Sequence, residues 1–269
     1  MITINNLSFS YSKEPVLDHI STRFETGRVY GLLGSNGVGK SSLFKMICGL
    51  LTSKEGSIDV DGYSPAQRKA NFYSKIYYIP EDFSGPAMSV KNFALGNGIF
   101  YPNFDRDLFF RLMKEFELDP EKKFTELSLG QHKRVILAYA LSLKTEYLLL
   151  DEPTNGLDIP AKSEFRKILS SVIDEKQTVI ISTHQVRDVE NLLDHIIILD
   201  KRAVLLDKSI DEIQKEYYFD NSPYQPEDAL YCESGLGGYS FVRKNTEGAE
   251  SKINIEILFN YINSTKNSK

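Results

Sequence analysis

Short apolar runs recur along the chain and alternate with segments whose apolar residues follow helical spacing. Runs typical of strands buried on both faces of a parallel sheet lie at residues 29–33, 76–79, 147–150 and 178–183. Two further runs, at 196–199 and 203–206, indicate a closing hairpin. Because strands alternate with helices, the pattern predicts an α/β protein with a parallel sheet.

The start of the chain follows a different pattern. Residues 2–10 and 16–24 read as strands on either side of the turn 12–15, and residues 56–62 alternate between glycines like an exposed strand. A period of two is typical of strands with one solvated face, as in antiparallel sheets. These segments predict an antiparallel β-subdomain beside the parallel sheet.

The middle of the chain carries an insertion between sheet elements. From residue 83 to 118, aromatic and leucine residues follow helical spacing and little reads as a strand. Ser128 is a favourable N-cap for the helix that follows. We therefore predict a helical subdomain over about residues 83–145.

Beyond residue 216 the composition changes. Tyrosine, proline and glycine become frequent before an amphipathic stretch at 255–262. We predict a first domain over residues 1–215 and a small C-terminal α+β accessory module over residues 216–269.

The segment 34–41, Gly-Ser-Asn-Gly-Val-Gly-Lys-Ser, lies between a buried run and a helical pattern. A glycine-rich loop between a strand and a helix is the arrangement in which a P-loop binds phosphate. The backbone N–H groups of the loop face inward, and the positive end of the helix dipole points at the phosphate. Lys40 is expected to reach the β- and γ-phosphates, and Ser41 to ligate Mg²⁺. A plain glycine-rich turn is the alternative, but every motif position is filled. The residues predicted to bind the phosphates are Gly34, Ser35, Asn36, Gly37, Val38, Gly39, Lys40, Ser41 and Ser42.

Three polar residues follow buried runs further along the chain. Asp151 and Glu152 come at the end of one run, and His184 directly after the next. An aspartate in this position holds Mg²⁺ in P-loop NTPases, and a neighbouring carboxylate can polarise an attacking water. His184 would contact a γ-phosphate, since α/β sheets bind ligands at the carboxyl ends of strands. Alone, these residues could be a strand-ending turn and a structural histidine; beside a P-loop, the functional interpretation is favoured.

Composition limits the partners and the compartment. The 269 residues are 41% hydrophobic, which suits a soluble globular protein with a sizeable core. A net charge of −5 argues against a surface that coats nucleic acid, and two cysteines cannot build a disulfide framework. The start lacks a signal-peptide pattern, and no apolar run approaches the ~18 residues of a membrane span, which predicts a cytoplasmic protein.

Taken in order, the motifs resemble those of the nucleotide-binding subunit of an ATP-binding cassette (ABC) transporter, over about residues 2–210. The segment 34–41 resembles Walker A, 127–131 (Leu-Ser-Leu-Gly-Gln) the family signature, 147–151 Walker B, and 155–158 the D-loop. Glu152 then matches the catalytic carboxylate, His184 the switch histidine, and Tyr11 the aromatic that stacks on adenine.

The resemblance implies an α/β P-loop NTPase with a RecA-like parallel core, an antiparallel β-subdomain and the helical ABC insertion. It implies an ATPase that uses ATP and Mg²⁺ and forms a head-to-tail dimer with two ATP molecules at the interface. Each ATP would lie between the P-loop of one subunit and the signature of the other. On this pattern Lys40, Glu152 and His184 are catalytic, and the metal ligands are Ser41, Asp151 and Glu81. The nucleotide contacts outside the P-loop are Tyr11, Ser128, Gly130, Gln131 and Asp158.

The implied partner is a transmembrane permease that docks on the helical insertion, with the chain at the inner face of the cell membrane. The dimer would be a homodimer or a pseudo-dimer with a related cassette. The tail from Tyr231 resembles the ends of exporter cassettes, which favours export. The alternative is a soluble ABC ATPase of a cofactor-assembly, ribosome or DNA complex. The single P-loop disfavours a ribosome-acting protein, since those typically carry two cassettes. The lack of sustained heptads disfavours a DNA-repair protein, since those carry long coiled coils. A small-molecule kinase would have no use for the signature.

Two positions depart from the family pattern. Glu81 stands where the family has the Q-loop glutamine, and Leu129 where the signature usually has a glycine. A carboxylate can still ligate Mg²⁺ but adds negative charge near the phosphates, so we expect altered metal dependence or coupling rather than inactivity. Because Ser128 and Gly130 are kept, Leu129 is expected to be a tolerated variation.

Overall fold

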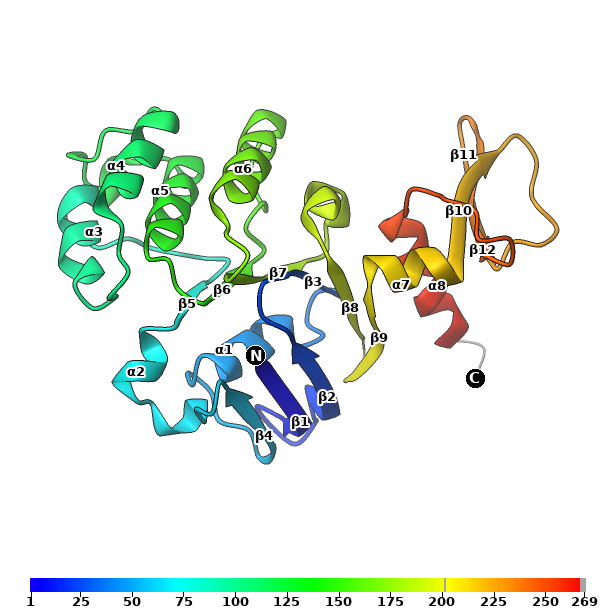
Figure 1. Ribbon diagram of the computed structural model, residues 1–269, viewed down its shortest axis with the longest axis horizontal. Helices are drawn as coiled ribbons and strands as arrows, with labels where there is room; N and C mark the ends of the chain where they lie inside the picture. The colour runs from blue at the N-terminus through cyan, green and yellow to red at the C-terminus, as the bar shows by residue number, and fades with distance from the viewer. Residues whose placement is uncertain (201, 267–269) are drawn as a thin grey trace.

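The computed structural model describes residues 1–200 and 202–266, and its largest sheet has six strands in the order β5–β6–β7–β3–β8–β9 (Figure 1). The strands are β3 (Val29–Leu33), β5 (Ile76–Ile79), β6 (Tyr147–Asp151), β7 (Thr178–Thr183), β8 (His195–Asp200) and β9 (Ala203–Ser209). Neighbours pair in parallel except β9, which pairs antiparallel with β8. The predicted α/β fold and closing hairpin are therefore confirmed.

A second, three-stranded antiparallel sheet packs on one side of this core (Figure 1). It has the order β2–β1–β4, with β1 (Ile2–Phe9), β2 (Leu17–Phe24) and β4 (Glu55–Val60). Helix α1 (Lys40–Ile47) lies on the same side, between this sheet and the core sheet. The predicted antiparallel strands are thus present, within a residue or two of their expected ends.

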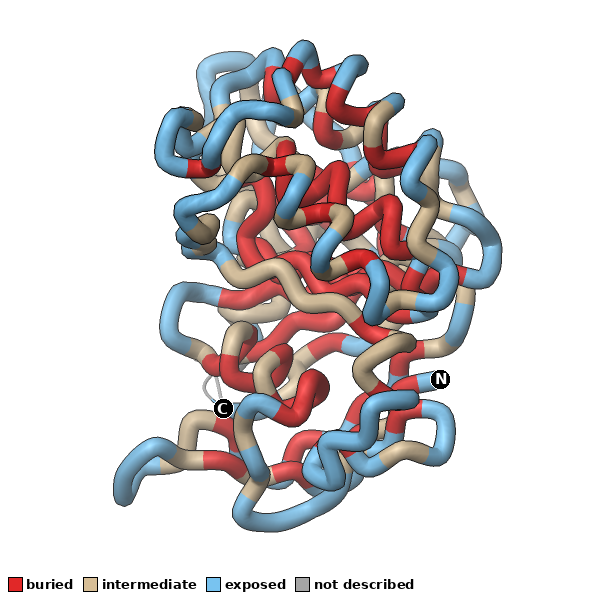
Figure 2. The backbone as a smooth tube through the Cα atoms, turned by 90° about the vertical axis from the view of Figure 1, so that its left-hand side faces the viewer, coloured by how far each residue is buried: buried red, intermediate tan, exposed pale blue. Residues whose placement is uncertain are grey.

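Helices cover the opposite face of the core sheet. They are α3 (Val90–Gly98), α4 (Arg106–Glu115), α5 (Leu129–Ser142) and α6 (Ile159–Val172), and a short α2 (Ala70–Tyr73) precedes β5. Successive residues of β6 point to opposite faces: Leu148 and Leu150 join the core under these helices, whereas Tyr147 and Leu149 join the core under α1. The buried residues are accordingly concentrated in the central layers of the protein (Figure 2). The middle of the chain is helical, as predicted.

The C-terminal part forms a third sheet beyond β9 (Figure 1). Its elements are α7 (Ile210–Glu216), β10 (Tyr217–Ser222), β11 (Tyr231–Gly235), β12 (Gly238–Lys244) and α8 (Ile255–Lys266), with the strand order β10–β12–β11. The amphipathic stretch predicted at 255–262 is part of α8. Helix α7 was not predicted, although Ser209 and Glu212 form a capping box at its start. The division at residue 215 falls within α7 and stays a prediction.

Within residues 1–200 and 202–266, no helix has the length and apolar character needed to cross a membrane.

Candidate phosphate and metal site

The loop between β3 and α1 is shaped by glycines. Gly37 and Gly39 have φ of +81° and +108°, and a Cβ on Gly34 would lie 2.4 Å from the Leu199 carbonyl oxygen. Lys40 is 6% exposed, and its Nζ donates to the carbonyl oxygens of Gly34 at 2.7 Å and Ser35 at 3.2 Å. The ammonium group therefore lies against the loop itself, where it can meet a phosphate held by the loop.

Glu152 is the residue on which the polar side chains of the site converge. Its Oε1 lies 3.5 Å from Lys40 Nζ and 2.9 Å from His184 Nδ1, and the residue is 4% exposed. These contacts are possible because β6 and β7 are adjacent, so the residues after them meet at one edge of the sheet. Glu152 has φ +47°, a left-handed conformation that is uncommon outside glycine and clusters at functional sites.

Asp151 is held by two hydroxyl groups. Ser182 Oγ donates to Oδ1, and Tyr78 OH donates to Oδ2 at 3.0 Å. Burial, together with the neighbouring Asp151 carboxylate, raises the pKa of Tyr78, which therefore remains a hydrogen-bond donor at neutral pH. Each carboxylate oxygen keeps a further lone pair, so Asp151 suits a hard cation such as Mg²⁺. The half-buried Ser41 on α1 is the other predicted ligand on this side.

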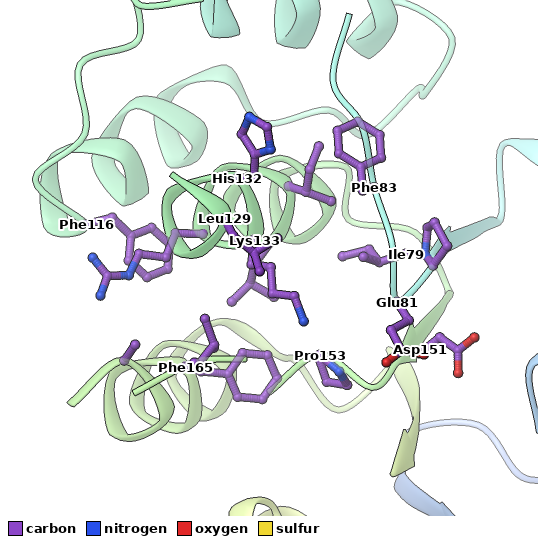
Figure 3. A pocket seen from close by; sticks show the side chains of 16 residues that line it. Ile79, Glu81, Phe83, Phe116, Leu129, His132, Lys133, Asp151, Pro153 and Phe165 are labelled. Atoms are coloured by element: carbon purple, nitrogen blue, oxygen red, sulfur yellow. The ribbon is translucent and has the colours of Figure 1, made fainter. Parts of the chain in front are cut away.

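The third predicted ligand, Glu81, has a protein partner. Its Oε1 accepts a hydrogen bond from Asn155 Nδ2 at 2.7 Å. Glu81 and Asp151 line the same cavity between α5 and α6 (Figure 3). Glu81 is thus tied to the turn after β6, and its role as a metal ligand stays a prediction.

Tyr11 lies at the open side of the P-loop helix. The residue is 63% exposed. Its ring packs edge-on against Phe9, with 4.8 Å between the ring centroids, and its OH lies 3.0 Å from Ser42 Oγ. An exposed ring fixed at both ends is a suitable stacking surface for a nucleobase. The structure therefore fits the predicted adenine contact, which remains a prediction.

The signature residues form an exposed helix start. Ser128 Oγ accepts from the Gln131 N–H at 3.3 Å, and Gln131 Oε1 accepts from the Ser128 N–H at 2.9 Å, so the predicted N-cap is confirmed as a capping box. A Cβ on Gly130 would meet only Leu157, at 3.9 Å. Asp158 caps α6 through the Ala161 N–H at 2.9 Å. Among the described residues, none of these side chains hydrogen-bonds to Lys40, Glu152 or His184.

Sequence reasoning missed the residues that support the site. Tyr78 and Ser182 hold Asp151, and Lys133 holds the turn after it. Asn155 was assigned to the D-loop, but its contact with Glu81 was not predicted. Ser182 had a signal, since a serine in a buried run requires a partner. The partners of Tyr78 and Lys133 depend on side-chain direction, which the sequence does not reveal. Burial lowers the pKa of Lys133, against the opposite pull of nearby carboxylates, chiefly Glu81.

Comparison with known proteins identifies ATP-binding proteins of transport systems as relatives of this chain. A family profile described as "ABC transporter" matches residues 17–155. The zinc uptake system ATP-binding protein ZurA of Listeria innocua is 33% identical over 80% of this chain and 88% of its own length. The lantibiotic transport ATP-binding protein SrtF of Streptococcus pyogenes is 32% identical over 78% of this chain and 92% of its own.

Solved structures show the same fold. An ATP-binding subunit of an ABC transporter matches with a TM-score of 0.72 at 24% identity, over 80% of this chain and 92% of that one. The cbiO1 protein of Clostridium perfringens, part of the transporter complex cbiONQ, matches with a TM-score of 0.65 at 27% identity, over 79% and 89%.

Proposed function

This chain belongs to the ABC transporter family and is an ATP-binding subunit with ATPase activity, and we propose that it works as a head-to-tail dimer that drives a partner permease. The observation that carries the proposal is the separation of the site into two parts. Lys40, Glu152 and His184 converge at one edge of the sheet, whereas Ser128 presents an exposed helix start on α5.

Hydrolysis follows from the first part. Lys40 and the loop amides would hold the β- and γ-phosphates, and the Glu152 carboxylate would orient a water and accept its proton. His184, hydrogen-bonded to Glu152, would fix the carboxylate and approach the γ-phosphate. Mg²⁺ held by Ser41 and Asp151 would neutralise charge on the phosphates when bound.

Dimerisation follows from the second part. The start of α5 offers unpaired N–H groups and the positive end of the helix dipole, together with the Ser128 hydroxyl, and its surface is open. A γ-phosphate presented by a second subunit would complete it. ATP would then join two copies of the chain, and hydrolysis would release them, which converts bond cleavage into a rigid-body movement.

The partner we propose is a membrane permease that docks on the helical segment 83–145 and holds the chain at the inner face of the membrane. Relatives in zinc uptake, lantibiotic transport and cobalt import systems support a transport role over a ribosome, DNA or cofactor-assembly complex. For direction we propose export, on the tail from Tyr231. These relatives include import systems, so transport measured in vesicles with the purified permease decides between the two directions.

The dimer is tested by sedimentation of the Glu152→Gln variant with ATP and Mg²⁺. We expect a dimer with nucleotide and a monomer without it. Ser128→Arg in the same background should keep the protein monomeric. The long arginine side chain would occupy the space at the start of α5 where the partner's phosphate would bind. A strictly monomeric Glu152→Gln protein, even with the permease present, overturns the proposal.

A further inference from the structure

The turn that presents Glu152 requires support from outside. Its left-handed backbone at φ +47° is unfavourable for a residue with a side chain and persists only where the surroundings fix it. Within the turn, the Asn155 N–H donates to the Glu152 carbonyl at 3.1 Å, and the Glu152 N–H donates to Ser182 of β7. The carbonyl oxygens of Glu152 and Asn155 face the helical segment.

Lys133 of α5 supplies that support. Its Nζ donates to the carbonyl oxygen of Glu152 at 3.3 Å and to that of Asn155. Asn155 is also held from the other side, by Glu81 at 2.7 Å. The ammonium thus connects the two ends of the turn, at Glu152 and Asn155, and fixes the direction in which Glu152 points.

The surroundings of Lys133 leave little room for water. It enters a largely apolar space between α5 and α6 (Figure 3), bounded by Phe116, Pro153 and Phe165. The cavity has a volume of about 30 Å³, which admits one or two water molecules. Removing the amine would take its donor from both carbonyl groups. The Glu152 carbonyl would keep the Asn155 N–H, whereas the Asn155 carbonyl would lose its side-chain donor, which is costly in an apolar setting.

Lys133 also lies on the helix that begins at Ser128. Five residues of α-helix span about 7.5 Å, so the two residues move as parts of one rigid element. We propose that Lys133 is a positioning residue that transmits the position of the signature end of α5 to the turn carrying Glu152. In the dimer, binding of the partner's nucleotide at Ser128 would set the catalytic carboxylate of the chain's own site. This coupling rests on the proposed function; the contact between Lys133 and the turn does not.

The kinetic test compares Lys133→Met with Lys133→Gln. Methionine keeps the length of the side chain and removes the donors, so kcat for ATP should fall about tenfold or more while KM stays within about twofold. Glutamine can donate to a single carbonyl oxygen more easily than to both, so its kcat should be intermediate. The Hill coefficient for ATP should fall towards one in both variants. Lys167→Met, which removes an exposed lysine from α6, should behave like the wild type.

The structural test uses hydrogen exchange on the nucleotide-free chain. Lys133→Met should speed exchange in peptides covering residues 152–158 and leave peptides covering residues 34–41 unchanged. Wild-type turnover, or unchanged exchange at 152–158, overturns the inference. If the wild type itself hydrolyses no ATP, the proposed function fails, and the exchange result still decides whether Lys133 holds the turn.

Discussion

The Nδ1 atom of His184 lies 2.9 Å from Oε1 of Glu152, and the same oxygen lies 3.5 Å from Nζ of Lys40. The histidine after β7 and the lysine at the start of α1 thus meet at one carboxylate oxygen of the residue after β6. The carboxylate is therefore oriented by the fold before any nucleotide arrives.

Glu152→Gln should abolish turnover while leaving ATP bound. The amide cannot accept a proton from water, and the loss of a general base costs about 10²-fold or more. Steady-state phosphate release and equilibrium ATP binding measure the two effects. Glu146→Gln, at an exposed carboxylate beside β6, is the matched control. Normal hydrolysis by the Glu152 variant means that this residue is not the base.

Lys40→Ala should instead weaken nucleotide binding. The substitution removes the ammonium group that donates to the Gly34 and Ser35 carbonyls in the loop. We expect the dissociation constant for ATP to rise about tenfold or more, by loss of a charge-assisted contact. Titration calorimetry against Lys45→Ala, on the same helix, provides the comparison. Equal affinities would place the phosphates elsewhere.

Tyr78→Phe should raise the Mg²⁺ requirement. The phenol donates a hydrogen bond to Asp151 Oδ2. Without it, the carboxylate of the proposed metal ligand is less firmly oriented. A hydrogen bond to a charged group contributes about 1.5–3 kcal/mol, so half-saturation by Mg²⁺ should move by about tenfold or more. Tyr77→Phe is the control, because that ring packs on Tyr101 and Tyr139 on the opposite face of the sheet. An unchanged Mg²⁺ curve contradicts the role of Tyr78.

Glu81→Gln should change the ATPase rate or the Mg²⁺ affinity. The amide oxygen can still accept the Asn155 hydrogen bond, so the turn stays in place while one negative charge leaves the site. Rates measured over a range of Mg²⁺ concentrations separate the two effects. Kinetics identical to those of the wild type would show that the carboxylate neither binds metal nor acts on the phosphates.

Glu216→Gln should destabilise the junction with the third sheet in a pH-dependent way. Burial alone would raise the pKa of Glu216, but hydrogen bonds from Lys208 of β9 and Lys244 of β12 outweigh it and lower the pKa from 4.5 to about 2. Since the folded-state pKa is depressed, the stabilisation is complete above about 4.5 and is lost as pH falls towards 2. The difference in Tm between the variant and the wild type should be constant from about pH 8 to 5 and narrow below that. A constant difference at all pH values would exclude a charge effect.

Periodicity was sufficient for the layers of the fold. The runs at 147–150 and 178–183 are apolar because β6 and β7 are covered on both faces, and the helix caps at Ser128 and Asp158 carry their own local signal. Helix α7 was missed because it is short and its apolar residues are few. The strands of the third sheet were not located because polar residues and glycine interrupt the alternation of apolar positions in them.

The site was predictable where a motif fixes both residue type and spacing, as for Lys40, Asp151 and Glu152. The supporting contacts were not, because they join residues distant in sequence through side-chain direction. Asp151 and Tyr78 are 73 positions apart, and meet only because β5 and β6 are neighbours. Lys133 is half-buried, as are Gln131, His132 and Arg134 on the same helix, so exposure does not single it out. Its contact depends on the carbonyl oxygens that lie opposite it in the fold.

The strand order imposes a sequence of events on a chain during its synthesis. β7 lies between β6 and β3, pairing Ile181 with both Leu150 and Gly31. A nascent chain that has reached Asp158 already contains the P-loop and both acidic residues, yet it lacks the strand that pairs with both β6 and β3. Because domains fold as units while they emerge, we expect ATP affinity to appear late and in one step, after β7 has left the ribosome.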